Sequence, residues 1–188
     1  MGNDFYSFPY ENELGFHDYY DEEGRSLRKT FLRAPLNFTR ISSRYSGRRF
    51  HPVQKRWKAH LGTDYAAPTG TPIMSTADGV IIAAQYTSAN GNYVKVRHNS
   101  TYTTQYLHMS KIKPGIKNGE KVKQGDVIGY VGSTGLATGP HVCYRFWVNG
   151  KQVDPYKQKL PQAKPLEDDR MEAYKSYMFG LKKELDNL

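Results

Sequence analysis

The sequence has a single cysteine, Cys143, among 188 residues. No disulfide can therefore form within the chain, and the redox environment stays open. No apolar run approaches the roughly 20 residues that a membrane-spanning helix needs, and no charged-then-apolar leader predicts a secretory signal in this chain. Acidic residues are in the minority, 18 against 27 lysines and arginines, which gives a net charge of +9. This imbalance favours a polyanionic partner: nucleic acid, an anionic membrane surface or a carboxylate-rich wall polymer.

The basic residues are scattered and form no long block. No zinc-finger pattern or RNA-recognition motif accompanies them, so nucleic acid is the weaker of these partners. A content of 38% hydrophobic and 13% aromatic residues excludes a largely disordered chain. The length suits one good core with appendages.

The middle of the chain, from Ile41 to about Pro155, has the pattern of an all-β domain. Short runs rich in β-branched and aromatic residues alternate with Gly, Pro and Asn pairs. Asn90-Gly91 and Asn149-Gly150 are the strongest hairpin signals. The regular spacing predicts a mostly β fold, an antiparallel sheet or sandwich, because alternating helices are missing from the pattern.

The two ends of the chain differ from the middle. The first 35 residues are aromatic and acidic, and Glu23-Gly24 predicts a hairpin turn between short strands. After Pro165 the apolar residues follow helical spacing, which predicts an amphipathic helix docked on the sheet, with partner binding as the less favoured alternative. The predicted organisation is an N-terminal β arm at 1–35, a domain at 36–160 and a C-terminal helical segment at 161–188.

Two pairs of metal-ligating residue types stand at even spacing. His60 and Asp64 lie four residues apart, and His141 and Cys143 lie two apart in a predicted strand. Even spacing in an extended chain places both members of a pair on one face. With His108 at the end of another strand, these residues can surround one zinc ion, since His, Asp and Cys all ligate zinc.

Each pair by itself is also compatible with a simple buried or surface role. Cys143 with a histidine base could alternatively act as a thiol nucleophile. His108 would then be the better base, because His141 projects parallel to Cys143 from the same strand. His51 is a further candidate for lining the site, although an exposed turn position before a proline is equally compatible.

Taken together, four motifs in order resemble the lysostaphin-type (LytM-type) zinc endopeptidases that cleave bacterial peptidoglycan. The resemblance covers roughly residues 36–157, and the flanking segments resemble the Gram-negative envelope members. In those proteins N-terminal domains precede the catalytic one, and the arm at 1–35 would be a remnant of them. The motifs are HLGTDYAAPTGTPI, QYLHMS, GEKVKQGDVIGYVGSTG and ATGPHVCYRFWVNG.

The resemblance implies roles for five residues. His60 and Asp64 match the first two zinc ligands of the family's H-x-x-x-D motif. Cys143 stands at the third ligand, where the family has the second histidine of an H-x-H motif. His141 and His108 match the two non-ligand catalytic histidines. With Asp64 and a thiolate together balancing the charge of Zn²⁺, we expect metal binding to persist and turnover to be slower.

The resemblance also implies a location and a substrate. It indicates one zinc ion per chain, a place in the bacterial cell envelope or periplasm, or secretion, and hydrolysis of the D-alanyl–diaminopimelate cross-link in preference to a glycine bridge. Tyr106, Thr134 and Arg145 are candidate contacts in the substrate groove, with structural roles as the alternative. The competing function is a catalytically impaired domain that binds the wall or regulates another wall hydrolase or envelope protein.

Overall fold

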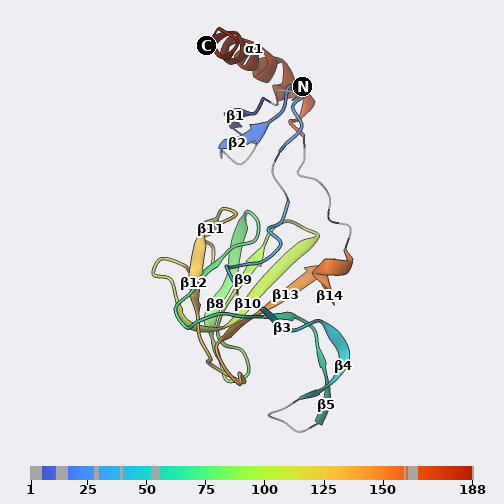
Figure 1. Ribbon diagram of the computed structural model, residues 1–188, viewed down its shortest axis with the longest axis vertical. Coiled ribbons are helices and arrows are strands. Elements are labelled where there is room, and N and C mark those ends of the chain that lie inside the picture. The colour runs from blue at the N-terminus through green and yellow to red at the C-terminus, as the bar shows by residue number, and fades with distance from the viewer. Residues whose placement is uncertain are drawn as a thin grey trace. The chain divides into compact units, whose positions relative to one another are not determined.

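The computed structural model describes residues 6–11, 17–27, 30–38, 40–51, 56–158, 160 and 165–187. The chain forms two compact units, Phe31–Gln158 and, from its two ends, Met1–Thr30 with Lys159–Leu188. Figure 1 shows the elements of both. In chain order they are β1 (Phe8–Glu11), β2 (His17–Tyr20), β3 (Arg40–Ser43), β4 (Ser46–His51), β5 (Arg56–His60), β6 (Thr63–Ala66), β7 (Pro72–Met74), β8 (Gly79–Thr87), β9 (Gly91–Arg97), β10 (Tyr102–Ile112), β11 (Lys121–Val122), β12 (Val127–Val131), β13 (His141–Val148), β14 (Lys151–Val153), the 3₁₀ turn Pro155–Lys157 and α1 (Asp168–Leu185).

The larger unit is built on an antiparallel sheet of ten strands. Its main path runs β11-β8-β9-β10-β13-β6-β3, with β12 pairing with β10 and β7, and β14 pairing with β13. Strands β4 and β5 form a separate hairpin of two strands. The prediction of a mostly β, antiparallel fold is confirmed, and the sheet brings segments distant in sequence side by side.

The central strands β10 and β13 are buried because apolar or aromatic residues occupy most of their positions. Leu107, Met109, Val142 and Phe146 are almost fully inaccessible to solvent. Burying each such side chain contributes roughly 1.5–3 kcal/mol. These two strands are therefore a rigid base for whatever side chains they present at their ends.

The two strongest hairpin signals are confirmed. Asn149 (φ 49°) and Gly150 (φ 76°) connect β13 to β14, the positive-φ pair of a tight hairpin turn. Gly91 (φ 65°) follows the turn from β8 to β9. A Cβ at Gly91 would lie 2.2 Å from Oγ1 of Thr134, so glycine is required there for close packing as well.

The smaller unit joins the two ends of the chain. Helix α1 buries Tyr174 and Met178 in a cluster with Phe8 and Tyr20 of the β1–β2 hairpin, and with Leu166. The sequence predicted that this helix docks on the main sheet; its buried residues instead pack on the arm, whose aromatic rings supply an apolar surface of their own. The turn predicted at Glu23-Gly24 is present, with φ 72° at the glycine.

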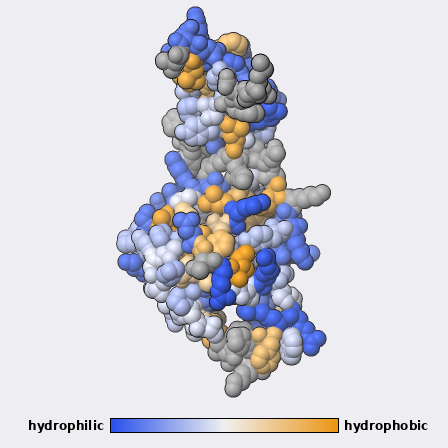
Figure 2. Space-filling view, viewed as in Figure 1, coloured by the Kyte–Doolittle hydropathy of each residue, from blue (hydrophilic) through white to orange (hydrophobic). Residues whose placement is uncertain are grey.

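The surface agrees with the composition. The face seen in Figure 2 carries mostly hydrophilic side chains over the described residues, as expected for a chain with a net charge of +9. Among the described residues, no helix has both the length and the apolar character required to span a membrane.

Candidate metal centre

The sheet register brings the two predicted residue pairs together. Asp64 of β6 lies directly opposite Cys143 of β13 in the antiparallel ladder. Side chains of directly opposed residues on one face of a sheet are close enough to touch. His60 ends β5 and reaches the same place across a short break that contains Gly62. A ligand atom from each of His60, Asp64 and Cys143 lies within 4.8 Å of the other two.

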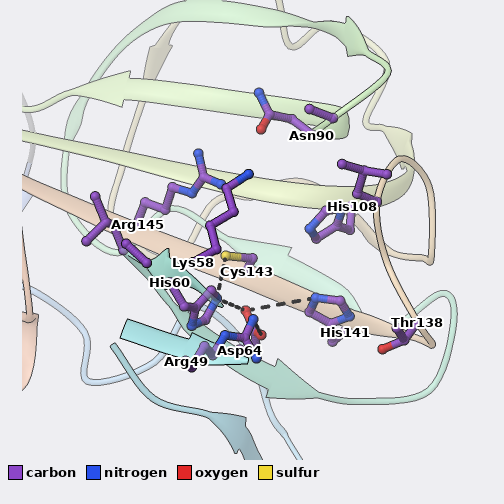
Figure 3. Close-up of a pocket in the computed structure, with 14 residues that line it drawn as sticks. Arg49, Lys58, His60, Asp64, Asn90, His108, Thr138, His141, Cys143 and Arg145 are labelled. Atoms are coloured by element: carbon purple, nitrogen blue, oxygen red, sulfur yellow. Dashed lines mark hydrogen bonds and ion pairs between the residues drawn. The ribbon is translucent and has the colours of Figure 1, made fainter. Parts of the chain in front are cut away.

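The contacts within this group bring three potential ligand atoms close together. Nε2 of His60 lies 2.9 Å from Oδ1 of Asp64 and 3.6 Å from Sγ of Cys143 (Figure 3). Nδ1 of His60 is 3.1 Å from the carbonyl oxygen of Arg44, to which it donates. The 2.9 Å contact with Asp64 is therefore satisfied either by a proton on Nε2, which makes the ring an imidazolium paired with the carboxylate, or by a metal ion that both atoms coordinate.

Burial sets the protonation of the other two donors. Burial raises the pKa of the Cys143 thiol, the negative charge of Asp64 raises it further, and the guanidinium of Arg145 opposes both. For Asp64, burial raises the pKa, but the hydrogen bond and charge of His60 in its protonated form outweigh this and hold the pKa below its ordinary value. A metal ion deprotonates a thiol that coordinates it.

The donor set fits a catalytic zinc site. One imidazole nitrogen, one carboxylate oxygen and one sulfur make the three protein ligands that such sites use beside an open position. Cys143 is 2% and Asp64 7% exposed, so the site is shielded from bulk water. The same burial and the raised pKa of the thiol argue against Cys143 as a free thiol nucleophile, since the thiolate is the reactive form.

His141 and His108 lie beside this group. Nε2 of His141 is 3.9 Å from Oδ1 of Asp64, and the rings of His141 and His108 are 4.8 Å apart between centroids. Nδ1 of His141 donates to the carbonyl oxygen of Gly139 at 2.8 Å, and Nδ1 of His108 donates to that of Thr134 at 2.7 Å. In the neutral rings both Nε2 atoms are therefore unprotonated.

A backbone irregularity directs His108 to the site. The ladder between β10 and β9 shifts register between Tyr106 and Met109, and His108 has φ 65°, which is uncommon for a residue with a side chain. Regular alternation would place His108 on the same face as Tyr106. The bulge reverses this, and the ring reaches His141 instead. Burial, helped by the charge that His141 carries when protonated, lowers the pKa of His108 to about 4, so the ring is neutral at pH 7.

A polar cavity of about 150 Å³ contains these groups. Arg145, predicted as a groove contact, lines it, and so do three residues that the sequence reasoning missed: Arg49, Lys58 and Asn90. The signal for Lys58 was available, because it precedes His60 by two residues in a strand and shares its face. The side chain of His51 lies outside the described residues.

Two predicted groove contacts have other positions. Tyr106 is 0% exposed and its hydroxyl oxygen accepts a hydrogen bond from the backbone N–H of Thr76 at 2.9 Å. The prediction that it contacts substrate is wrong, because it points from β10 into the core on the face opposite to the site. Thr134 does not line the cavity; its hydroxyl donates to the carbonyl of Met109 at 2.7 Å, and its own carbonyl holds His108.

The comparison with known sequences identifies the family. The model of Peptidase family M23 matches residues 58–155. The peptidoglycan DD-endopeptidase ShyC of Vibrio cholerae is 50% identical over 157 residues, which are 84% of this chain and 36% of ShyC. This chain therefore spans little more than a third of the length of that relative.

Solved structures agree with this result. A zinc-containing peptidase from Vibrio cholerae superposes with a TM-score of 0.66 at 39% identity, over 82% of this chain and 47% of that one. The catalytic domain of lysostaphin from Staphylococcus simulans gives a TM-score of 0.55 at 28% identity, over 62% of this chain and 89% of that one. The lysostaphin-like resemblance and fold are confirmed, and the chain belongs to the metallopeptidases of family M23.

Proposed function

We propose that this chain is the catalytic part of a zinc-dependent endopeptidase that hydrolyses the peptide cross-links of peptidoglycan, in preference the D-alanyl–diaminopimelate bond. The observation that carries the proposal is the group of His60, Asp64 and Cys143 donors within 4.8 Å, with the rings of His141 and His108 beside it. The similarity to a named peptidoglycan DD-endopeptidase supports the choice of substrate. A location at the cell envelope, and partners among other wall hydrolases or envelope proteins, stay predictions.

His60, Asp64 and Cys143 are the residues that would hold zinc. When bound, zinc supplies a Lewis acid that polarises a carbonyl oxygen and lowers the pKa of water. The chain contributes the geometry: Arg44 fixes the His60 ring through its carbonyl oxygen at 3.1 Å, and Arg49 holds Asp64 with a guanidinium nitrogen 3.7 Å from Oδ2. Such outer contacts orient ligands and sustain their basicity.

His141 is the proposed general base. In its neutral form Nδ1 carries the proton that it donates to Gly139, which leaves Nε2 as the basic nitrogen. This Nε2 lies 3.9 Å from the Asp64 carboxylate in the donor group. Water that attacks the scissile carbonyl would transfer a proton to this Nε2, and the imidazolium would then return it to the amine of the leaving residue. His108 faces the same space, and its contact with the carbonyl of Thr134 keeps its ring in a fixed orientation.

The test combines metal analysis with digestion of purified peptidoglycan. We expect stoichiometric zinc in the wild type, loss of most zinc in Cys143→Ala, and retention in the matched variant Cys143→His, which replaces sulfur by another good zinc ligand. The wild type should release cross-link fragments from peptidoglycan. A chelator should abolish this release, and added zinc should restore it. A wild type that takes up no zinc would contradict the peptidase and favour a wall-binding or regulatory domain.

A further inference from the structure

Two cations border the cavity at positions set by strand alternation. Lys58 precedes His60 by two residues in β5, and Arg145 follows Cys143 by two in β13, so each shares a face with a donor of the metal group. Both line the cavity that contains the donors. In Figure 3 the two side chains lie on the Cys143 side of the group, and Arg49 lies near Asp64.

The charges of this cavity are not balanced within the described residues. Asp64 is the one carboxylate among the described residues that line it, and Arg49 already contacts that carboxylate at 3.7 Å. No carboxylate of the described part of the chain forms an ion pair with Lys58 or Arg145. Nε of Arg145 is also buried without a hydrogen-bond partner. A buried donor without a partner costs free energy unless a ligand supplies the acceptor.

We propose that Lys58 and Arg145 bind a free carboxylate on the residue that follows the scissile bond. This inference rests on the proposed function and adds to it the substrate feature that the pocket selects. An arginine presents a planar fork of donors that matches a carboxylate, and a lysine adds a mobile point charge. The pair therefore recognises an anion held beside the metal group and gains little from a neutral group at that position.

The chemistry of the cross-link provides such an anion. In a D-alanyl–diaminopimelate cross-link, the carbon attached to the scissile nitrogen also carries a free carboxylate. In a glycine bridge, the carbon at that position leads to another neutral amide. A cation pair next to the scissile bond consequently distinguishes the two cross-links by charge, because only the diaminopimelate cross-link offers a carboxylate at that position.

Binding to an inactive protein tests this directly. The probe is a synthetic peptide containing D-alanyl–diaminopimelate, with the carboxylate beside the scissile nitrogen either free or converted to the carboxamide. Isothermal titration with the zinc-loaded His141→Ala protein should show about 10- to 100-fold tighter binding of the free carboxylate, the range of charge-assisted hydrogen bonds. Adding Arg145→Gln should bring the ratio close to one, and Lys58→Met should reduce it about 3- to 10-fold.

The controls separate this inference from its alternatives. Lys58 is exposed on the hairpin, so Lys58→Met leaves the fold intact even if Arg145→Gln impairs it, and the exposed Lys151→Met should leave the ratio unchanged. Equal binding of the two peptides would overturn the proposal. A preference that neither substitution reduces would also overturn it, because the metal itself could then hold the carboxylate. Because binding is measured without turnover, a wild type that fails to cleave peptidoglycan contradicts the proposed function alone.

Discussion

The metal centre and a cluster of buried hydroxyl groups share strands β10 and β13, and they differ in how completely their polar atoms are paired. In the hydroxyl cluster, Oγ1 of Thr76 lies 3.0 Å from the hydroxyl oxygens of both Tyr106 and Tyr144, and the backbone N–H of Thr76 donates to Tyr106 at 2.9 Å. In the metal centre, His60 and Asp64 oppose two acceptors at 2.9 Å. The first cluster is complete by itself, whereas the second needs a proton or a metal ion between Nε2 of His60 and Oδ1 of Asp64.

Two histidines make the same contrast. Burial lowers the pKa of both His98 and His108 to about 4. Nδ1 of His98 donates to the carbonyl of Asp78 at 2.6 Å, and its Nε2 is 2.8 Å from the hydroxyl oxygen of Thr104. Within the described part of the chain, His108 has a hydrogen bond at Nδ1, to the carbonyl of Thr134, and none at Nε2. A depressed pKa thus does not identify a reactive histidine; a ring nitrogen left free toward a cavity does.

The largest effect should come from His141→Ala, which removes the proposed general base beside the metal centre. We expect peptidoglycan cleavage to fall about 10²- to 10⁴-fold, the usual contribution of general acid–base catalysis. Zinc content and the free energy of unfolding should stay close to those of the wild type, because His141 is not among the proposed ligands. Cleavage assays and elemental analysis on the same preparation measure both; loss of zinc together with activity would make His141 a ligand.

Gly62→Ala should weaken the metal centre through packing. A Cβ at this position would lie 2.9 Å from Sγ of Cys143 and 3.0 Å from the carbonyl oxygen of Tyr144, and the backbone atom cannot yield easily. We expect zinc affinity to fall about 10- to 100-fold, the range found when the support of a metal ligand is changed. Competition with a zinc indicator measures the affinity. Gly47→Ala is the matched control, since its Cβ would meet no atom within 4 Å; equal losses in both variants would refute the packing explanation.

Tyr106→Phe should disrupt the buried hydroxyl cluster and leave the metal centre unchanged. It leaves the N–H of Thr76 without its acceptor in a fully buried place, so we expect about 2 kcal/mol less free energy of unfolding in denaturant titrations. Activity per folded molecule should be unchanged. Reduced activity with unchanged stability would restore the earlier idea that Tyr106 contacts substrate.

The smallest effect concerns pH and His98. Its pKa is about 4 in the folded protein and about 6.5 in the unfolded chain, so between these values the unfolded state binds more protons. The contribution of neutral His98 to the free energy of unfolding is therefore complete above pH 6.5 and is lost as the pH falls toward 4. Denaturant unfolding at pH 7 and pH 5 should show a decrease on the order of 1 kcal/mol greater in the wild type than in His98→Asn. An equal pH dependence of stability in both proteins would contradict this role of His98.

Local patterns in the sequence were enough to predict the strands, the Asn-Gly turns and the pairs of potential metal ligands. Period-two alternation and turn residues are local properties, so the shared face of His141 and Cys143 in β13 was predictable from spacing alone. His60 and Asp64 lie in different strands, β5 and β6, on either side of a break at Gly62, so alternation within one strand does not explain their proximity. The assignment of roles to these residues came from the family resemblance and remains a proposal.

The face that each strand presents to the site depends on tertiary contacts, which the sequence pattern does not reveal. The bulge with φ 65° turns His108 away from the face that alternation assigns to it, while Tyr106 keeps its place in the core. The packing of α1 on the arm, and the arrival of Arg49 and Lys58 at the cavity, likewise depend on contacts between distant segments. Such outcomes follow from register and from the irregularities that shift it, and one residue of shift moves a side chain to the opposite face.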